Sequence, residues 1–139
     1  MEKAGVKNKK RVTLGDKDAY LAPKVFIRQS ATEIIATYCD KPYAANKSIY
    51  ILTNKENTEQ SKSMLKYTCG VLNSDLVTFY CRINKIIRAE KGKTPQIKIS
   101  DLKDVRIHVD NHYFEEIVQI VEQLLRNPKD KMLSRRLNE

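Results

Sequence analysis

The chain has 139 residues, of which 41% are hydrophobic and 31% are charged, and its net charge is +9. This length predicts one domain with flanking segments and enough apolar residues for a core. No apolar run approaches the roughly 20 residues of a membrane-spanning helix. The N-terminal residues also lack the apolar segment of a secretory signal. Three cysteines without CxxC spacing argue against a zinc knuckle and a disulfide framework, and they favour a cytoplasmic location.

Basic residues are concentrated in two segments of the chain. Residues 82–98 hold six bases and one acid, and residues 1–24 hold seven bases and three acids. Such clustering favours a nucleic acid or an anionic membrane as partner. The alternative is a solvated surface that only keeps the protein soluble.

The chain divides into three parts by composition. Residues 1–19 are polar and basic, and we predict a flexible arm or linker there. Order is expected to begin near Tyr20, and the domain is expected to span residues 20–126. Residues 127–139 form a polar, basic tail.

Three strands are predicted in the first half of the domain. Residues 24–29 read as a strand that turns and returns over residues 33–38, which predicts a hairpin. A loop containing a proline follows over residues 40–47. Residues 48–53 predict a third strand, which is too apolar for an exposed edge.

Two helices are predicted in the middle of the chain. Asn57 or Thr58 is expected to cap the first, and Gly70 within it offers room for a close neighbour. Asn73 or Ser74 is expected to break or recap the helical run. The second helix carries apolar residues at three- and four-residue steps, which predicts that this face is core. These residues are Leu76, Phe79, Tyr80, Ile83 and Ile87.

The last third predicts two short strands and a helix. Strands are expected over residues 96–99 and 105–108, with Ser100 capping the turn between them. A helix should open at Asp110 or Asn111 and end at the Asn-Pro pair. Its aligned apolar residues are Phe114, Ile117, Val121 and Leu124. Together the elements predict an α+β fold, in which a small, irregular, mostly antiparallel sheet packs with helices and the C-terminal helix is longer.

The common catalytic and nucleotide-binding motifs are absent from this sequence. There is no GxGxxG, GxxxxGK[ST], GxSxG or HExxH motif. His108 and His112 flank Asp110, and this group is the basis of one hypothesis, a small metal-dependent nuclease. A loop or capping role for the same residues is the favoured interpretation.

Basic residues stand beside amides and aromatics in three places, and this pattern predicts a nucleic-acid interface. Lysine and arginine bind phosphates, whereas amides and guanidinium groups also read base edges. We expect Arg28 and Gln29 to contact bases, and Lys91 and Lys93 to contact phosphates. The full predicted interface is Arg28, Gln29, Ser30, Lys41, Tyr43, Asn46, Lys47, Arg88, Lys91, Lys93 and Lys98.

Four ordered motifs resemble one family, the TaqI-like C-terminal specificity domain. That domain is the target recognition domain of type IIG restriction-modification enzymes and related adenine-N6 DNA methyltransferases. The resemblance covers about residues 22–126. It rests on KVFIRQS with EIIAT (24–30 and 33–37), KSIYIL (47–52), GVLNSDLVTFYCR (70–82) and PQIKISDLKDVRI (95–107).

Two positions depart from the pattern of the family. Lys47 stands where the family usually has asparagine, although Asn46 is adjacent. The usual proline after the final strand is absent, because Ile107 runs directly into His108.

The resemblance implies a non-catalytic fragment that recognises double-stranded DNA. A methyltransferase domain, and in some members a nuclease domain, would accompany it in the same polypeptide or as a partner subunit. S-adenosylmethionine and a divalent metal would bind only in those catalytic domains, so we expect no cofactor in this fragment. We also expect no membrane partner. The alternative function is a protein–protein interaction module, which predicts an exposed apolar stripe over residues 113–125.

Overall fold

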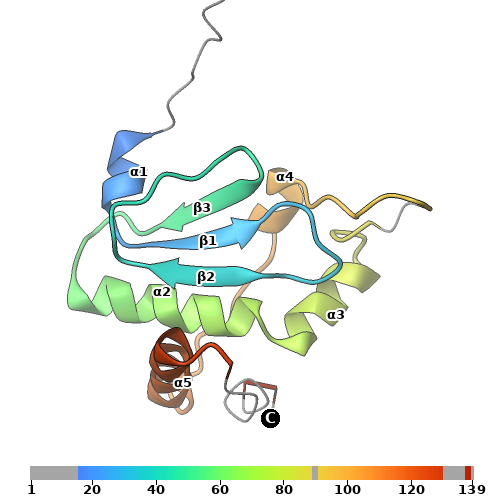
Figure 1. Cartoon of the computed structure of the whole chain (residues 1–139). Helices are drawn as coiled ribbons and strands as arrows, with labels where there is room; N and C mark the ends of the chain where they lie inside the picture. Colours follow the sequence, from blue (N-terminus) through green and yellow to red (C-terminus); the bar gives the residue numbers. More distant parts are fainter. Residues whose placement is uncertain (1–15, 89–90, 130–136, 139) are drawn as a thin grey trace, which may run out of the picture.

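The computed structural model describes residues 16–88, 91–129 and 137–138, and these residues form a three-stranded sheet with five helices (Figure 1). This arrangement confirms the predicted α+β class. The strand order is β2-β1-β3, and both pairings are antiparallel. The elements are α1 (Lys17–Leu21), β1 (Lys24–Arg28), β2 (Ala36–Cys39), β3 (Ile49–Thr53), α2 (Glu59–Leu72), α3 (Asp75–Ile83), α4 (Ile99–Lys103) and α5 (Phe114–Arg126).

Helix α1 is the first element of the described residues. Residues 1–15 lie outside the described residues, and α1 starts before the expected onset of order near Tyr20. Strand β2 begins at Ala36, later than expected. The Ile35 carbonyl before it still accepts the Arg28 N–H of β1 at 3.0 Å, but two N–H groups at the start of this segment bond to side chains of the helical region instead. The Ile34 N–H donates to Thr78 Oγ1 at 3.1 Å, and the Ala36 N–H donates to Asn73 Oδ1 at 3.0 Å.

Strand β3 lies at an edge of the sheet, so the prediction that it is too apolar for an edge is wrong. Its apolar residues are explained by one covered face rather than by a second neighbouring strand. Tyr50 packs against the core together with Leu102, Val105 and Ile107, which follow from the last third of the chain.

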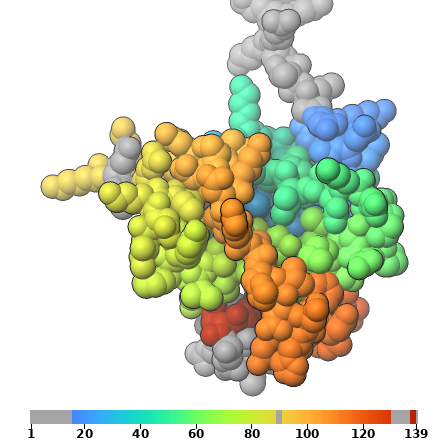
Figure 2. All heavy atoms as spheres, turned by 180° about the vertical axis from the view of Figure 1, so that it is seen from behind, coloured from blue at the N-terminus to red at the C-terminus, as the bar shows by residue number. Residues whose placement is uncertain are grey.

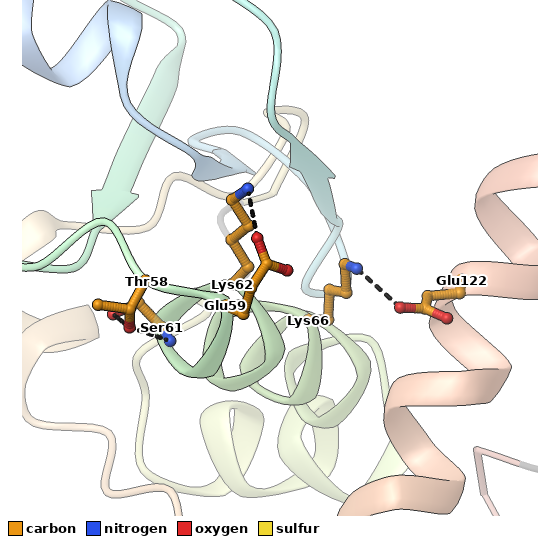
Figure 3. A network of polar contacts seen from close by, with 6 residues as sticks. All are labelled: Thr58, Glu59, Ser61, Lys62, Lys66 and Glu122. Carbon is orange, nitrogen blue, oxygen red and sulfur yellow. Dashed lines mark hydrogen bonds and ion pairs between the residues drawn. The ribbon is translucent and has the colours of Figure 1, made fainter.

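Helix α2 begins as predicted, and α5 packs across it. Thr58 is the N-cap, and its Oγ1 accepts the Ser61 N–H at 3.1 Å (Figure 3). The Lys66 Nζ and a Glu122 carboxylate oxygen of α5 are 2.7 Å apart. The expected close approach at Gly70 is confirmed, because a Cβ at this position of α2 would lie only 2.8 Å from Ile117 Cγ2 of α5.

Helix α3 is rotated away from its predicted orientation. Leu76, Phe79, Tyr80 and Ile83 are 75%, 61%, 46% and 62% exposed, so the prediction that they are core is wrong for these four. Thr78 and Cys81 are buried in their place. The orientation of the helix is set by polar bonds at its start, where Ser74 caps it and the Thr78 hydroxyl accepts the Ile34 N–H.

The two strands predicted after α3 do not form. Gln96 makes a single antiparallel bridge with Ser30, and α4 begins at Ile99. Ser100 lies inside α4 and does not cap it, because the N-cap is Lys98, which makes no side-chain capping bond. Residues 105–108 follow as a non-strand segment, and the Tyr67 hydroxyl donates to the carbonyl of the last of them at 2.9 Å.

Helix α5 begins later than expected and ends where predicted. The carboxylate of Asp110 accepts the His112 N–H at 2.9 Å, so the expected opening residue forms a separate turn before the helix. Asn127 is the C-cap. Val118, Ile120 and Val121 are buried, and Gly70 admits α5 against α2. The apolar stripe over residues 113–125 is therefore used within the domain, which contradicts the premise of the interaction-module alternative.

Candidate nucleic-acid interface

The turn after β1 and the segment before α4 are joined by backbone hydrogen bonds. The Ile97 N–H donates to the Gln29 carbonyl at 2.8 Å, and the Ala31 N–H donates to the Pro95 carbonyl at 3.1 Å. These bonds hold two segments together that are more than 60 residues apart in the sequence. In Figure 1 the segment between α3 and α4 projects beyond the ends of the strands, and Figure 2 shows its protrusion from behind.

A cleft of about 630 Å³ lies where these two segments meet. It brings together five residues of the predicted interface, and the remaining lining comes from Tyr50 and residues 94–97. Its base is rigid, because Ile97 is only 1% exposed and its carbonyl accepts the Tyr50 hydroxyl at 2.8 Å. The five predicted residues are Gln29, Ser30, Arg88, Lys93 and Lys98.

Arg88 is held in a defined orientation at the rim of the cleft. Its Nε donates to the Lys85 carbonyl at 3.0 Å, and its Nη2 lies 3.3 Å from Asp101 Oδ2 in α4. The arginine side chain is half exposed, so this ion pair is screened by water and contributes little to stability. The pair positions the guanidinium group while its charge stays accessible to an anion.

A second cleft of about 580 Å³ adjoins the first and shares Arg88 and Pro95 with it. Arg82 and Lys85 contribute two further cations to this second cleft. The Arg82 Nη2 donates to the Thr32 carbonyl at 2.7 Å, which fixes the guanidinium group beside the turn. The two clefts thus form one basic surface, which we call the basic channel, and its cations are Arg82, Lys85, Arg88, Lys93 and Lys98.

Lys85 occupies a backbone conformation that lysine rarely adopts. Its φ is +56°, in the left-handed region, and the following Ile86 N–H donates to the Cys81 carbonyl at 2.8 Å. This is the usual C-terminal turn of a helix, in which glycine is the preferred residue. A lysine here costs backbone energy, and strained residues cluster at functional sites. Its place in the basic channel gives that cost a functional explanation.

The other predicted interface residues are divided between the two ends of the sheet. Arg28 and Lys47 lie at the same end as the cleft, because the Gln29 N–H donates to the Ser48 carbonyl at 2.9 Å. Asn46 holds the adjoining turn, since its Oδ1 accepts the Ser48 N–H at 2.9 Å.

Lys41 and Tyr43 belong to the opposite end of the sheet. The Lys41 carbonyl accepts the buried Lys24 Nζ at 2.6 Å, and Lys24 pairs with the last residues of β2 and β3. The Tyr43 N–H donates to the same Lys41 carbonyl at 2.8 Å. Lys91, the last of the predicted interface residues, belongs to neither group and is exposed in the segment between α3 and α4.

Arg82, Lys85 and Gln96 were absent from the predicted interface. Gln96 lines the first cleft, and its bridge to Ser30 places it beside Gln29. The signal for Arg82 and Lys85 was the charge of residues 82–98, which includes both. The apolar spacing of the helix placed Arg82 and Lys85 off the predicted core face, where they could reach water or phosphate, but it did not indicate that the end of the helix faces the turn after β1.

The residues of the nuclease hypothesis serve local structure. The Asp110 N–H donates to the Tyr67 hydroxyl at 3.2 Å, and the His112 ring packs edge-on against Tyr113. No cluster of three or more histidine, cysteine, aspartate or glutamate residues suited to a metal occurs within the described ranges. Among the same residues, no helix is long and apolar enough to cross a bilayer.

Comparison with known protein families supports the resemblance found in the sequence. The family model of the TaqI-like C-terminal specificity domain matches residues 1–107. The match includes the whole basic channel and stops before α5. A search of curated proteins found no match. The chain belongs to the family of TaqI-like C-terminal specificity domains.

Proposed function

We propose that this chain recognises a specific sequence in double-stranded DNA on behalf of a restriction-modification enzyme. The enzyme would methylate adenine at N6, and its methyltransferase domain, with or without a nuclease domain, would act in the same polypeptide or as a partner subunit. S-adenosylmethionine and a divalent metal would bind those domains, and this chain would contribute no catalytic group. The observation that carries the proposal is the basic channel around an amide-lined cleft.

The cations of the channel suit the phosphate backbone of DNA. Arg88, Lys93 and Lys98 lie on the first cleft, and Arg82 and Lys85 extend the positive surface along the second. Contacts of lysine and arginine with phosphates supply affinity without sequence information, and they fix the position of the protein on the duplex.

Sequence reading would come from the polar groups inside the cleft. Gln29 and Gln96 are amides, and an amide pairs with two atoms of adenine in the major groove. Ser30 and Thr94 add hydroxyl groups that donate or accept. Arg28 stands at the end of β1, outside the residues that line the cleft. Gln29 is therefore the base reader that the cleft supports best.

The proposal predicts a difference between the two ends of the sheet. Lys98→Ala removes a cation of the cleft, so it should weaken binding to all duplexes and reduce the slope of log K against log salt by about 0.9. Lys41→Ala is the matched control, because Lys41 is an exposed lysine at the opposite end. Fluorescence anisotropy with labelled duplexes at several salt concentrations measures both slopes. Equal losses in the two variants would contradict this location of the interface.

Lys85→Gly separates binding from folding. Glycine adopts the positive φ of this position without strain, so the variant should be at least as stable as the wild type. Loss of the cation should still weaken DNA binding. Unchanged affinity together with an unchanged salt slope would exclude Lys85 from the interface.

Lys91→Ala tests the protruding segment of the loop. We expect it to weaken all sequences by a similar factor and to reduce the salt slope by about one. An unchanged salt dependence would remove Lys91 from the interface and would leave the basic channel as the binding surface.

A further inference from the structure

Helix α3 presents an apolar face to solvent. Its four exposed residues are spaced at three- and four-residue steps, so they lie on one side of the helix, opposite the buried Thr78 and Cys81. Contiguous exposed apolar surface of this kind marks interaction sites. We call this surface the α3 face, and it consists of Leu76, Phe79, Tyr80 and Ile83.

Charges of opposite sign flank the α3 face on the same side of the helix. Asp75 and Arg82 are seven residues apart, which is about two helical turns, so their side chains leave the helix in nearly the same direction. Arg82 is anchored by its bonds to the Thr32 carbonyl, at 2.7 Å from Nη2 and 3.3 Å from Nε. The Asp75 carboxylate makes no ion pair within the described residues.

The α3 face is complementary to the same face of a second copy whose helix runs in the opposite direction. When two copies of α3 pack antiparallel about a two-fold axis between Phe79 and Tyr80, Leu76 of each copy meets Ile83 of the other. The aromatic residues then meet across the axis. The two-fold axis is perpendicular to both helices, so the charged flanks of the two copies lie on the same side of the helix pair. Asp75 of each copy therefore lies beside Arg82 of the other.

We propose that the α3 face docks a second copy of this chain in that antiparallel arrangement. The net charge of +9 opposes self-association in general, but the flanks of this face carry one acid and one base in mutually attractive positions. Antiparallel helix dipoles favour the same orientation. Four side chains from each copy bury less than about 1,200 Å² in total, which is the range of weak complexes. The dimer is accordingly weak and depends on concentration.

Sedimentation of the whole chain without DNA tests the proposal independently of its function. The average mass should rise from 16.1 kDa toward twice that value as the concentration increases from about 10 µM to about 1 mM. Phe79→Asp places a charge at the centre of the face and should weaken association at least tenfold. Because Phe79 is largely exposed, the variant should fold, which circular dichroism verifies. A wild-type chain that stays monomeric throughout would overturn the proposal.

Charge reversal distinguishes this dimer from other contacts between copies. Asp75→Lys alone and Arg82→Glu alone should each fail to self-associate, because each sets like charges beside one another at both flanks. Mixed together, the two variants regain both attractive pairs and should form a dimer of one copy of each. Both variants are checked for folding by circular dichroism. Association of either variant alone as strongly as the wild type, or absence of a dimer in the mixture of folded variants, would contradict the antiparallel pairing.

Discussion

Helices α3 and α5 carry similar apolar stripes but use them differently. The stripe of α5 is buried against α2, where Gly70 lets the two helices come close, whereas the α3 face is exposed. Periodicity therefore shows that a helix has an apolar side, but not which way that side faces. On α3 the direction is determined by polar groups, namely the Ser74 cap and the bond from Ile34 to Thr78.

The largest expected contrast comes from the same truncation on the two helices. Ile120→Ala in α5 removes a buried side chain and should lower the free energy of unfolding by about 2–4 kcal/mol. Ile83→Ala in α3 removes an exposed side chain and should change it by less than about 0.5 kcal/mol. Chemical denaturation at low protein concentration, where self-association is negligible, measures both. Similar losses would show that the α3 face is packed within the monomer.

Gly70→Ala should have a smaller effect on the packed side. The new Cβ would lie 2.8 Å from Ile117 Cγ2 and 2.9 Å from Val121 Cγ2, and both methyl groups branch close to the backbone, where they yield little. Overpacking of this kind costs about 1–3 kcal/mol, offset in part by the better helix propensity of alanine, about 1 kcal/mol. We expect a net loss of up to about 2 kcal/mol by denaturation.

A double variant identifies the cause of that loss. In a Val121→Ala background one of the two close methyl groups is gone, so Gly70→Ala should cost less than in the wild type. Equal costs in the two backgrounds would mean that contact with Val121 is not the source of the destabilisation.

The smallest effect concerns Tyr38, whose buried hydroxyl has no hydrogen-bond partner in the part of the chain that the structure describes. Tyr38→Phe removes this hydroxyl and should raise the free energy of unfolding by about 1 kcal/mol at neutral pH. Burial, reinforced by the negative charge of Asp40, raises the pKa of Tyr38 to about 12.

This raised pKa also predicts a dependence on pH. In the unfolded chain Tyr38 ionises near pH 10, so between about pH 10 and 12 the unfolded state loses its proton first and the native state loses stability. The phenylalanine variant should lack this part of the alkaline loss. Denaturation of both proteins at neutral and alkaline pH measures the difference, and parallel curves would show that Tyr38 is solvated in the native protein.

Local patterns predicted much of the fold, because the forces behind them are local. The hairpin of β1, the Thr58 cap and the end of α5 depend on residues close in the sequence and are confirmed. The close approach at Gly70 is also confirmed, although its partners lie in the distant helix α5. The strands expected over residues 96–99 and 105–108 depend on partners elsewhere in the chain. They became a bridge, a short helix and a non-strand segment, because the turn after β1 accepts only a few backbone bonds from that region.

The candidate site was predictable in composition but not in arrangement. Clustered charge identified the segment around Arg88 and Lys98, and the short motif at Gln29 identified the turn after β1. Nothing local indicated that these segments meet in one cleft, because their meeting depends on backbone bonds between residues far apart in the sequence. The place of Lys41 at the opposite end of the sheet follows instead from the hairpin, because Lys41 comes after β2 has returned to the start of β1.

Selection from a randomised duplex library, with sequencing of the retained DNA at two salt concentrations, tests the central claim most directly. The wild type should enrich one short motif, and Lys98→Ala should enrich the same motif with weaker retention. Gln29→Ala should relax the preference at one or more positions of that motif, because it removes a base reader but no charge. Failure of the wild-type chain to retain any duplex at low salt, or the same motif from Gln29→Ala at full strength, would contradict DNA recognition through this cleft.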